Sequence, residues 1–480
     1  MTMTQAPPRR LVACLVFAAV SGSVVAGLGN PILVEVADRL SVSLEAAQWT
    51  LTMTLLVGGL VTPIVSRVAD GRHRKSALIG ALATIAVGSL IGAAVPTYAG
   101  LLVARALHGL GYSLVALTVG IAREHLGGAR LQRTMATLST SLAAGVGLAN
   151  PLVGLGVLVW DYRAGFLLAF VVSAAGALWV RHTVPAPRSD VDPVGQDRVG
   201  AVLLSLALGA LLLAVSRGNV WGWRSAAVLG LAAAGAALLV AWVVVERRVA
   251  LPMVDVRLAV RGGVLGANLG ALLIGWAVFG CAAVAVVLVQ SPPSGGLGGE
   301  QVVGLGRSVF VTGLLMVPMA LGSLVSPPIA RRLEARFGER VVFPVGSFAC
   351  AIGFAALARW HTSEVHVAVM MGLMGLGVGI AYAVLPGLIV ARTPRHRTTS
   401  ATGLNQVLRL VGGSLGAAVA AAVLSAHLDP GTRRPIESGY VAAALISLVV
   451  ALCATAAVWL LVPPTASEAS TEPSSLPYEP

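Results

Sequence analysis

Charged residues are scarce in this chain of 480 amino acids, at 11% of the total. Soluble globular domains carry about a quarter of their residues as Asp, Glu, Lys and Arg. Hydrophobic residues make up 57% of the chain, and its mean hydropathy is +0.87. This balance excludes a soluble globular protein. It also excludes a disordered one, because disordered segments combine low hydrophobicity with high charge.

Cysteine is scarcer still, with four residues in the whole chain. Cys14, Cys281, Cys350 and Cys453 each lie inside an apolar stretch, and none has the C-x-x-C spacing of a zinc or redox site. We interpret them as small buried hydrophobic residues rather than disulfide partners or metal ligands. The sequence therefore predicts no metal and no other cofactor.

Acidic residues are outnumbered, with 20 Asp and Glu against 33 Lys and Arg, which gives a net charge of +13. A surplus of that kind can indicate a nucleic-acid partner. No basic run in this sequence is long enough to form a groove for phosphates, so we expect no nucleic-acid binding.

Long apolar runs fill the rest of the chain. A transmembrane helix needs about 20 apolar residues, whereas barrel strands alternate and are about 10 residues long, so we predict an all-α polytopic membrane protein. We expect fourteen spans, at residues 11–33, 48–68, 76–95, 98–121, 134–159, 163–180, 199–216, 223–244, 263–289, 302–329, 341–358, 364–390, 399–425 and 439–462. A cleaved signal peptide is the alternative for the first run, which follows Arg9 and Arg10. That run is longer than an ordinary signal core, and thirteen more spans follow it.

The basic residues predict the orientation, because Lys and Arg are retained on the cytoplasmic side. With the N-terminus inside, 23 of the 33 fall in cytoplasmic segments, 8 fall outside, and Arg105 and Arg409 lie within spans. Both termini are therefore expected in the cytoplasm. Arginine outnumbers lysine 32 to 1 and Ala and Gly are abundant, which is typical of a GC-rich bacterial genome and points to a bacterial cytoplasmic (inner) membrane.

Polar breaks divide the spans into groups of six, two and six. We expect an N-terminal six-helix bundle, a cytoplasmic linker, two extra helices with a linker, a C-terminal six-helix bundle and a disordered cytoplasmic tail, at residues 1–180, 181–198, 199–262, 263–462 and 463–480. The basic loops at 66–75 and 330–340 resemble each other, which indicates duplication of a six-helix unit. Two such halves suit a transporter with its ligand site near the midplane, and we expect a monomer.

The loop after the second span contains Asp70, Arg74 and Lys75. An acid at a helix end beside a basic turn can form charge-assisted pairs that hold one conformation closed and release in another. The alternative is a basic cytoplasmic loop with an incidental acid.

Two arginines lie within spans, where a charge costs at least about 2.5–3.5 kcal/mol at the helix centre and usually faces a cavity. Arg105 opens segment 105–111, R-A-L-H-G-L-G, with His108 one turn further on the same face. Arg409 lies in segment 405–416, N-Q-V-L-R-L-V-G-G-S-L-G. The alternatives are an Arg105 that extends to the membrane surface and a His108 that only packs. The G-x-S-x-G spacing at the end of the second segment indicates small-residue helix packing rather than a nucleophile elbow.

The fifth span contains Gly147, Asn150, Pro151 and Gly154 in the order G-L-A-N-P-L-V-G. A proline kink flanked by small residues lets a helix slide tightly against its neighbour. Ordinary small-residue packing is the alternative.

Together these segments resemble the major facilitator superfamily, and within it the fourteen-span drug:proton antiporter group, over nearly the full length. The loop is similar to the family motif G-x-L-a-D-r-x-G-r-k, with departures at Ser66, Gly71 and His73. Segment 105–111 is similar to R-x-x-Q-G-x-G, with His in place of Gln. The resemblance implies a major facilitator fold of fourteen helices arranged 6+2+6, with Asp70 and its loop as a gate.

The fifth span resembles the antiporter motif g-x-x-x-G-P-x-x-G-G of exporters, with Asn150 and Leu155 in place of two glycines. It is the main argument for export over import. Segment 405–416 resembles the R-x-x-G-x-x-x-G stretch of the same group.

One departure bears on coupling. Aligned without gaps from Gln48 back to Asn30, the chain has Val25 where the family has a membrane aspartate. We place all 20 acids at or beyond the membrane surfaces, eight outside and twelve cytoplasmic, so no carboxylate is expected at mid-membrane. A buried acid is the usual proton carrier and also attracts cations. Coupling through His108, Asp70 or Glu35 stays open.

We therefore predict a secondary active transporter, not an enzyme, that exports an amphipathic small molecule by alternating access, with protons as the coupling ion. Two buried arginines without an acid favour a neutral, zwitterionic or anionic substrate over a permanent cation. The cavity candidates are Asn30, Arg105, His108, Tyr112, Asn150, Asn268, Trp276, Gln290, Tyr382, Asn405 and Arg409. Asn268 and Gln290 could instead form packing hydrogen bonds. A transport-inactive sensor or lipid-handling component is the second hypothesis, and a polytopic enzyme is the third.

Overall fold

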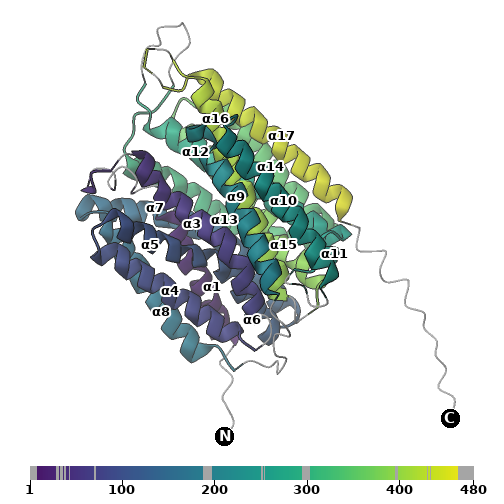
Figure 1. Cartoon of the computed structure of the whole chain (residues 1–480). Coiled ribbons are helices and arrows are strands. Elements are labelled where there is room, and N and C mark those ends of the chain that lie inside the picture. The colour runs from purple at the N-terminus through teal and green to yellow at the C-terminus, as the bar shows by residue number, and fades with distance from the viewer. Residues whose placement is uncertain are drawn as a thin grey trace, which may run out of the picture.

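The computed structural model of the protein is all-helical. It describes residues 8–28, 32, 36, 39–42, 44–69, 72–186, 197–249, 252, 254–293, 303–394, 398–429, 431–432 and 434–462. Within these ranges the regular elements are helices, and a lone β-bridge pairs Leu428 with Pro435. The helices run side by side in one bundle (Figure 1). The predicted all-α class is confirmed.

Eight elements precede the gap at 187–196. They are α1 (Pro8–Gly27), α3 (Leu44–Val68), α4 (Arg74–Ala94), α5 (Tyr98–His108), the 3₁₀ helix η1 (Gly109–Ser113), α6 (Leu114–His125), α7 (Gly128–Val159) and α8 (Arg163–Thr183). The elements α5, η1 and α6 form one continuous span, Tyr98–His125. A 3₁₀ segment inside a longer helix marks a local change of winding. Here it falls on the glycine-containing part of segment 105–111.

Nine elements follow the gap. They are α9 (Arg198–Trp221), α10 (Ala226–Arg248), α11 (Val256–Ala259), α12 (Gly262–Gln290), α13 (Val309–Phe337), α14 (Glu339–Arg359), α15 (Glu364–Ala391), α16 (Thr398–Ala426) and α17 (Glu437–Leu461).

Thirteen helices in the described ranges are long and apolar enough to cross a membrane. The helix α7, of 32 residues, is a further long helix in the same bundle, packed against α1 and α13. The arrangement of six, two and six spans stays a prediction.

One predicted span is displaced along the chain. We expected a helix over 302–329, and α13 instead begins at Val309, because the Ser308 hydroxyl accepts a bond from the Val311 amide and caps the helix there. It then continues through Pro327 and Pro328 to Phe337. The basic residues at 331, 332 and 336 therefore lie on the last turns of a helix rather than in a loop.

The helices before the gap pack mainly on one another, with α4 against α8 and α1 against α7. Those from α12 onward do the same, with α12 against α16 and α14 against both α15 and α17. We call these two groups, α1–α8 and α12–α17, the N-terminal and C-terminal halves. Each has its own cluster of buried apolar residues.

The two halves meet along two seams. The helix α7 packs against α13 and α15, while α3 and α6 pack against α16. The helix α9 pairs with α10 and contacts both α3 and α16, so it spans the second seam from outside (Figure 1).

One residue on α9 corrects a sequence expectation. The predicted span 199–216 ends just before Arg217, which makes this residue one of the eight basic residues expected outside. The helix continues to Trp221, and Arg217 is 3% exposed, with its guanidinium carbon 3.8 Å from the ring centroid of Trp49 on α3. This cation–π contact joins the extra helix pair to the N-terminal half.

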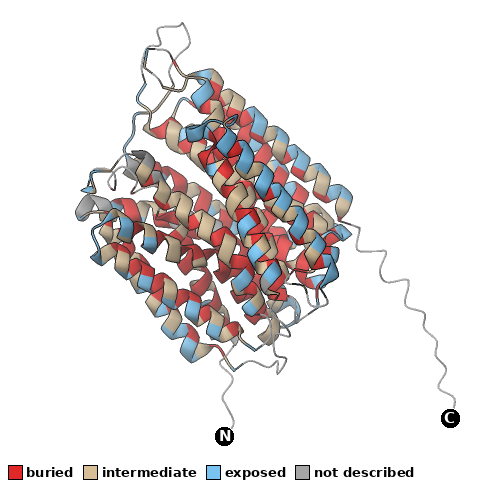
Figure 2. Ribbon diagram, in the orientation of Figure 1, coloured by how far each residue is buried: buried red, intermediate tan, exposed pale blue. Residues whose placement is uncertain are grey.

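Large apolar side chains cover the outside of the bundle. Leu460 and Val365 are 77% and 69% exposed, and exposed residues follow the outer faces of α10 and α17 (Figure 2). Soluble monomers rarely expose such continuous apolar surface. A lipid bilayer as the surrounding solvent accounts for it.

Candidate functional site

Arg105 lies in the last turn of α5 and is 1% exposed. Its Nη1 donates to the carbonyl oxygen of Val25 on α1 across 3.2 Å, and its Nε donates to that of Thr50 on α3, also across 3.2 Å. The Arg105 carbonyl in turn accepts from the Thr54 hydroxyl at 3.0 Å. Arg105 therefore joins three helices of the N-terminal half through backbone oxygens.

His108 lies beside it with both ring nitrogens in contact. Nδ1 is 3.4 Å from the Arg105 Nη1 group, and Nε2 is 2.9 Å from the Ser89 hydroxyl of α4. Because the guanidinium only donates, Nδ1 acts as the acceptor and Nε2 carries the proton toward Ser89. The ring also stacks on Phe166 of α8, with centroids 5.5 Å apart. These contacts all lie within the N-terminal half.

Tyr112 lies in η1 and packs its ring against Gly58 of α3. A Cβ at Gly58 would lie 2.6 Å from the Tyr112 ring, so the two helices approach closely there. Asn30, the remaining candidate of this half before α7, lies outside the described residues.

Arg409, on α16, has a different environment at the seam between the halves. It is 2% exposed, and its guanidinium carbon lies 3.6 Å from the ring centroid of Tyr382 on α15. Its Nη2 donates to the Ser139 hydroxyl of α7, in the other half, across 3.3 Å. Within the described ranges, Nε and Nη1 are buried without a hydrogen-bond partner. The group thus keeps unused donors at the junction of α7, α15 and α16.

Asn405 lies one turn before Arg409 but forms helix-packing bonds. Its Nδ2 donates to the Ala267 carbonyl at 3.0 Å and to Asn268 Oδ1 at 3.3 Å, both on α12. Asn268 in turn donates from its Nδ2 to the Ala259 carbonyl of α11 at 3.2 Å. This pair ties α16, α12 and the short α11 together.

The other candidates are spread through the bundle. Trp276 of α12 donates from Nε1 to the Ser447 hydroxyl of α17 at 3.3 Å, and Gln290 is the half-buried last residue of α12. Asn150 lies on α7 with a buried Oδ1 that has no partner among the described residues. The predicted set therefore does not gather in one pocket, and Arg409 with Tyr382 is the part that reaches the seam.

The fifth-span motif also lies on this seam. Built at Gly313 of α13, a Cβ would lie 3.2 Å from the backbone of Asn150 and Pro151, and one at Gly154 would lie 3.6 Å from Phe310. The small residues thus bring α7 and α13 of opposite halves together. Gly147 lies in α7 but outside the residues whose surroundings the structure describes.

Polar contacts join the halves at one end. Arg74 is buried at the start of α4, with Nη1 3.2 Å from Glu124 of α6 and Nε 3.3 Å from the Thr399 hydroxyl of α16. The neighbouring Arg123 donates to the Thr398 hydroxyl and, across 2.8 Å, to the Thr393 carbonyl. We call these six residues the seam clamp.

Lys75 of the gating loop forms a contact within the N-terminal half. Lys75 donates to the Val184 carbonyl across 2.6 Å and so caps the end of α8. Asp70 lies outside the described residues. Sequence reasoning placed Arg74 in the gate but missed Glu124 and Arg123, which follow an ordinary helix end and carry no motif of their own.

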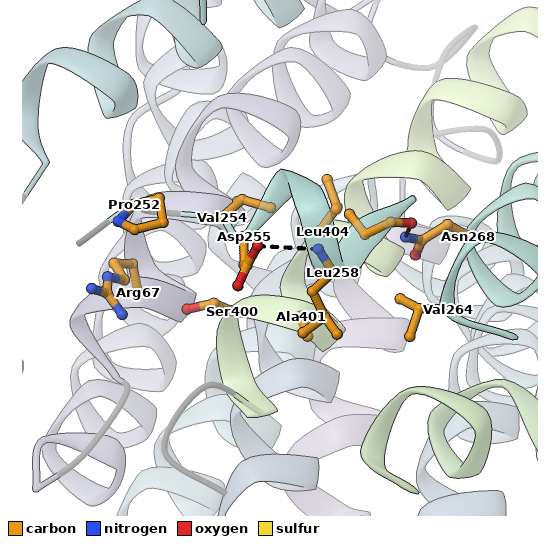
Figure 3. Close-up of a pocket in the computed structure, with 11 residues that line it drawn as sticks. Arg67, Pro252, Val254, Asp255, Leu258, Val264, Asn268, Ser400, Ala401 and Leu404 are labelled. Carbon is orange, nitrogen blue, oxygen red and sulfur yellow. Dashed lines mark hydrogen bonds between the residues drawn. The ribbon is translucent and has the colours of Figure 1, made fainter. Parts of the chain in front are cut away.

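A small pocket lies near the same end, between α3, α16 and the α10–α12 connection. Figure 3 shows Arg67, Asp255, Asn268 and Ser400 around it, with Asp255 bonded to the Leu258 amide. Its volume of about 20 Å³ is room for roughly one water molecule, whereas ligand pockets span several hundred Å³. This pocket is therefore a packing defect beside the clamp and not a substrate site.

Comparison with known proteins agrees with this architecture. Multidrug resistance protein Stp of Mycobacterium tuberculosis is 28% identical over 413 residues, which cover 83% of this chain and 73% of that protein. The uridine/deoxyuridine transporter of Lactococcus lactis is 28% identical over 404 residues, covering 81% and 82%. The solved human organic anion transporter MFSD10 shares the fold, with a TM-score of 0.64 at 15% identity over 95% of this chain and 100% of that one.

The family profile described as Major Facilitator Superfamily matches residues 13–299 and 301–478. This match covers nearly the whole chain, and the helical architecture accords with it. The protein is a multi-pass membrane protein that belongs to the major facilitator superfamily.

Proposed function

We propose that the protein is a secondary active transporter that exports an amphipathic small molecule from the cytoplasm by alternating access, coupled to the proton gradient. The observation that carries the proposal is the seam clamp, where Arg74 and Arg123 of one half bind the start of α16 in the other. Polar contacts at one end of two packed halves form and break without disturbing either core. That is the arrangement alternating access requires.

The positive-inside distribution assigns the clamp end to the cytoplasm. The conformation described here is then closed toward the cytoplasm. Opening that side requires Arg74 to leave Thr399 and Arg123 to leave Thr398 and the Thr393 carbonyl. The Arg74–Glu124 pair stays within the N-terminal half and positions Arg74 for re-closure.

Proton coupling has a candidate in the same cluster. Glu124 is 7% exposed at its side chain and pairs with Arg74. A proton on this carboxylate would remove the charge that orients Arg74 and so weaken its reach to α16. This supports coupling at the clamp rather than at mid-membrane, where Val25 stands in place of the expected acid and His108 is bonded within one half.

Export over import is supported by the fifth-span motif at the α7–α13 seam and by relatives named multidrug resistance proteins. The relative named as a uridine/deoxyuridine transporter keeps nucleosides among the substrates to be tested. The proposal includes fourteen spans arranged 6+2+6, both termini in the cytoplasm, a bacterial cytoplasmic membrane and a monomeric working unit.

Everted membrane vesicles test this proposal, because their lumen corresponds to the outside of the cell. With an acidic lumen, vesicles that carry the protein should accumulate at least one dye from a panel of amphipathic anions, neutral molecules and cations. Dissipating the pH gradient should stop the accumulation, and Arg123→Gln should reduce it. Accumulation equal to that of protein-free membranes for every dye would contradict transport and favour a sensor or lipid-handling role.

A further inference from the structure

Among the described residues, no ion pair joins the buried guanidinium of Arg409 to an acidic side chain. The sequences of α7, α12 and α16 contain no Asp or Glu, and α15 has only Glu364, in its first turn. Burying a charge without a partner is strongly unfavourable. The cation–π contact with the ring of Tyr382 offsets part of that cost. The remaining charge faces the seam uncompensated.

Arg105 is a buried arginine whose hydrogen bonds can be compared with those of Arg409. Its donors reach the Val25 and Thr50 carbonyls, so the group is bound on two sides by its own half. Arg409 has a single bond, to Ser139, and two buried nitrogens without partners in the described ranges. The two arginines are equally buried and differ in how many of their donors remain available.

The available donors lie where the halves meet. Ser139 belongs to α7 of the N-terminal half, while Arg409 and Tyr382 belong to α16 and α15 of the C-terminal half. A group bound to Arg409 therefore sits between elements that separate during alternating access. The site also has an aromatic face beside the charge, which suits a ligand with an apolar body next to its polar end.

We propose that Arg409 binds a carboxylate of the transported molecule, so that the substrates of this protein are amphipathic organic anions. A guanidinium presents paired N–H groups that match a carboxylate in a bidentate geometry. The ligand supplies the negative charge that the protein omits, and its apolar part rests against Tyr382. This proposal rests on the transport function above. It adds the charge of the substrate and names the residue that binds the charged group.

The test uses three ligands of one shape: 1-naphthoate, its neutral methyl ester and the cationic 1-naphthylmethylammonium ion. Each is titrated into the purified full-length protein, and affinity is read from the shift of the thermal unfolding midpoint with ligand concentration. The wild type should bind naphthoate at least about tenfold more tightly than the ester, which corresponds to about 1.4 kcal/mol. The ammonium ion should bind more weakly than either.

Two substitutions of one residue and a matched control make the assignment specific. Arg409→Gln should bring the affinity for naphthoate down to that for the ester, and Arg409→Lys should retain part of the difference because it keeps the charge without the fork. Arg217→Gln, at another buried arginine on an aromatic ring, should leave naphthoate binding unchanged.

A wild type that binds the ester or the ammonium ion as well as naphthoate, or binds none of the three, would overturn the proposal. Undiminished naphthoate binding by Arg409→Gln would overturn it too. If neutral or cationic dyes are still transported in everted vesicles, the exporter function survives while this inference fails. The wild-type preference among the three ligands decides the question even if a variant does not fold.

Discussion

The Nη1 group of Arg105 lies 3.2 Å from the carbonyl oxygen of Val25, the position at which the sequence resemblance predicts the membrane aspartate of the antiporter group. The arginine is thus bound to the backbone of the residue at which the predicted acid is missing. A neutral carbonyl satisfies a guanidinium donor but cannot take up a proton. This contact explains how the chain keeps a buried arginine in the N-terminal half while lacking the acid.

Val25→Asp should therefore destabilise the protein less than expected for an acid at a buried position. Val25 is 1% exposed, and an unpaired carboxylate buried there would cost several kcal/mol. Next to Arg105 the new acid gains a charge-assisted bond, and a buried ion pair is close to neutral relative to an apolar pair. We expect a smaller fall in the apparent melting temperature than for Val24→Asp, whose buried side chain points elsewhere on the helix. Equal losses in the two variants would show that Arg105 cannot reach the side chain at 25.

Arg105→Leu should destabilise the N-terminal half. The substitution removes the two guanidinium bonds that tie α5 to the Val25 and Thr50 carbonyls, and a hydrogen bond to a charged group contributes about 1.5–3 kcal/mol. The measurement is the apparent melting temperature of the purified protein. Arg409→Leu is the matched comparison, because it removes an uncompensated charge and should leave the melting temperature equal or higher. A larger loss at 409 than at 105 would contradict the roles assigned to the two arginines.

Glu124→Gln should shift the protein toward the state open to the cytoplasm. Without the carboxylate, Arg74 loses one of the contacts that hold it beside Thr399. The readout is the labelling rate of a cysteine placed at Thr402, which is 5% exposed on α16 near the clamp, by a membrane-impermeant maleimide in everted vesicles. The four natural cysteines are first replaced. We expect faster labelling in Glu124→Gln, and an unchanged rate would mean that the pair does not control closure.

Gly412→Val should abolish folding or transport. A Cβ at Gly412 would overlap the carbonyl oxygen of Leu272, because α12 and α16 are in backbone contact there. Gly230→Val is the control, since a Cβ at Gly230 of α10 meets no atom within 4 Å. The yield of monodisperse protein in detergent distinguishes them. A normal yield and normal transport for Gly412→Val would show that the α12–α16 contact is adjustable.

Hydropathy predicted the helices well because each span must carry about 20 apolar residues whatever it packs against. The predicted helix ends were wrong where local hydrogen bonds, rather than hydropathy, set the end of the helix. The Ser308 cap delays the start of α13, and Pro327 with Pro328 looks like an end although the helix continues. The Arg217 error has the same origin, since a polar residue near a span end is placed outside until its partner, Trp49, is seen.

The candidate site was less predictable. Arg105 and Arg409 give the same signal in a single sequence, an arginine inside an apolar run beside glycines. Their difference depends on which carbonyls and hydroxyls neighbouring helices present, and that is a tertiary property. Ser139 carries no signal at all, because it is one of many hydroxyl residues on α7. The loop motif predicted a gating role for Arg74, whereas no motif predicted that Glu124 is its partner.

Uptake by proteoliposomes that contain only this purified protein tests the central claim most directly. Inserted with the cytoplasmic face outward and given an acidic lumen, they should accumulate labelled 1-naphthoate above protein-free liposomes. Collapsing the pH gradient should release it, and Arg123→Gln should slow the uptake by weakening the clamp. Uptake no greater than in protein-free liposomes, for naphthoate and for its neutral and cationic analogues alike, would contradict the claim that this chain is a transporter driven by protons.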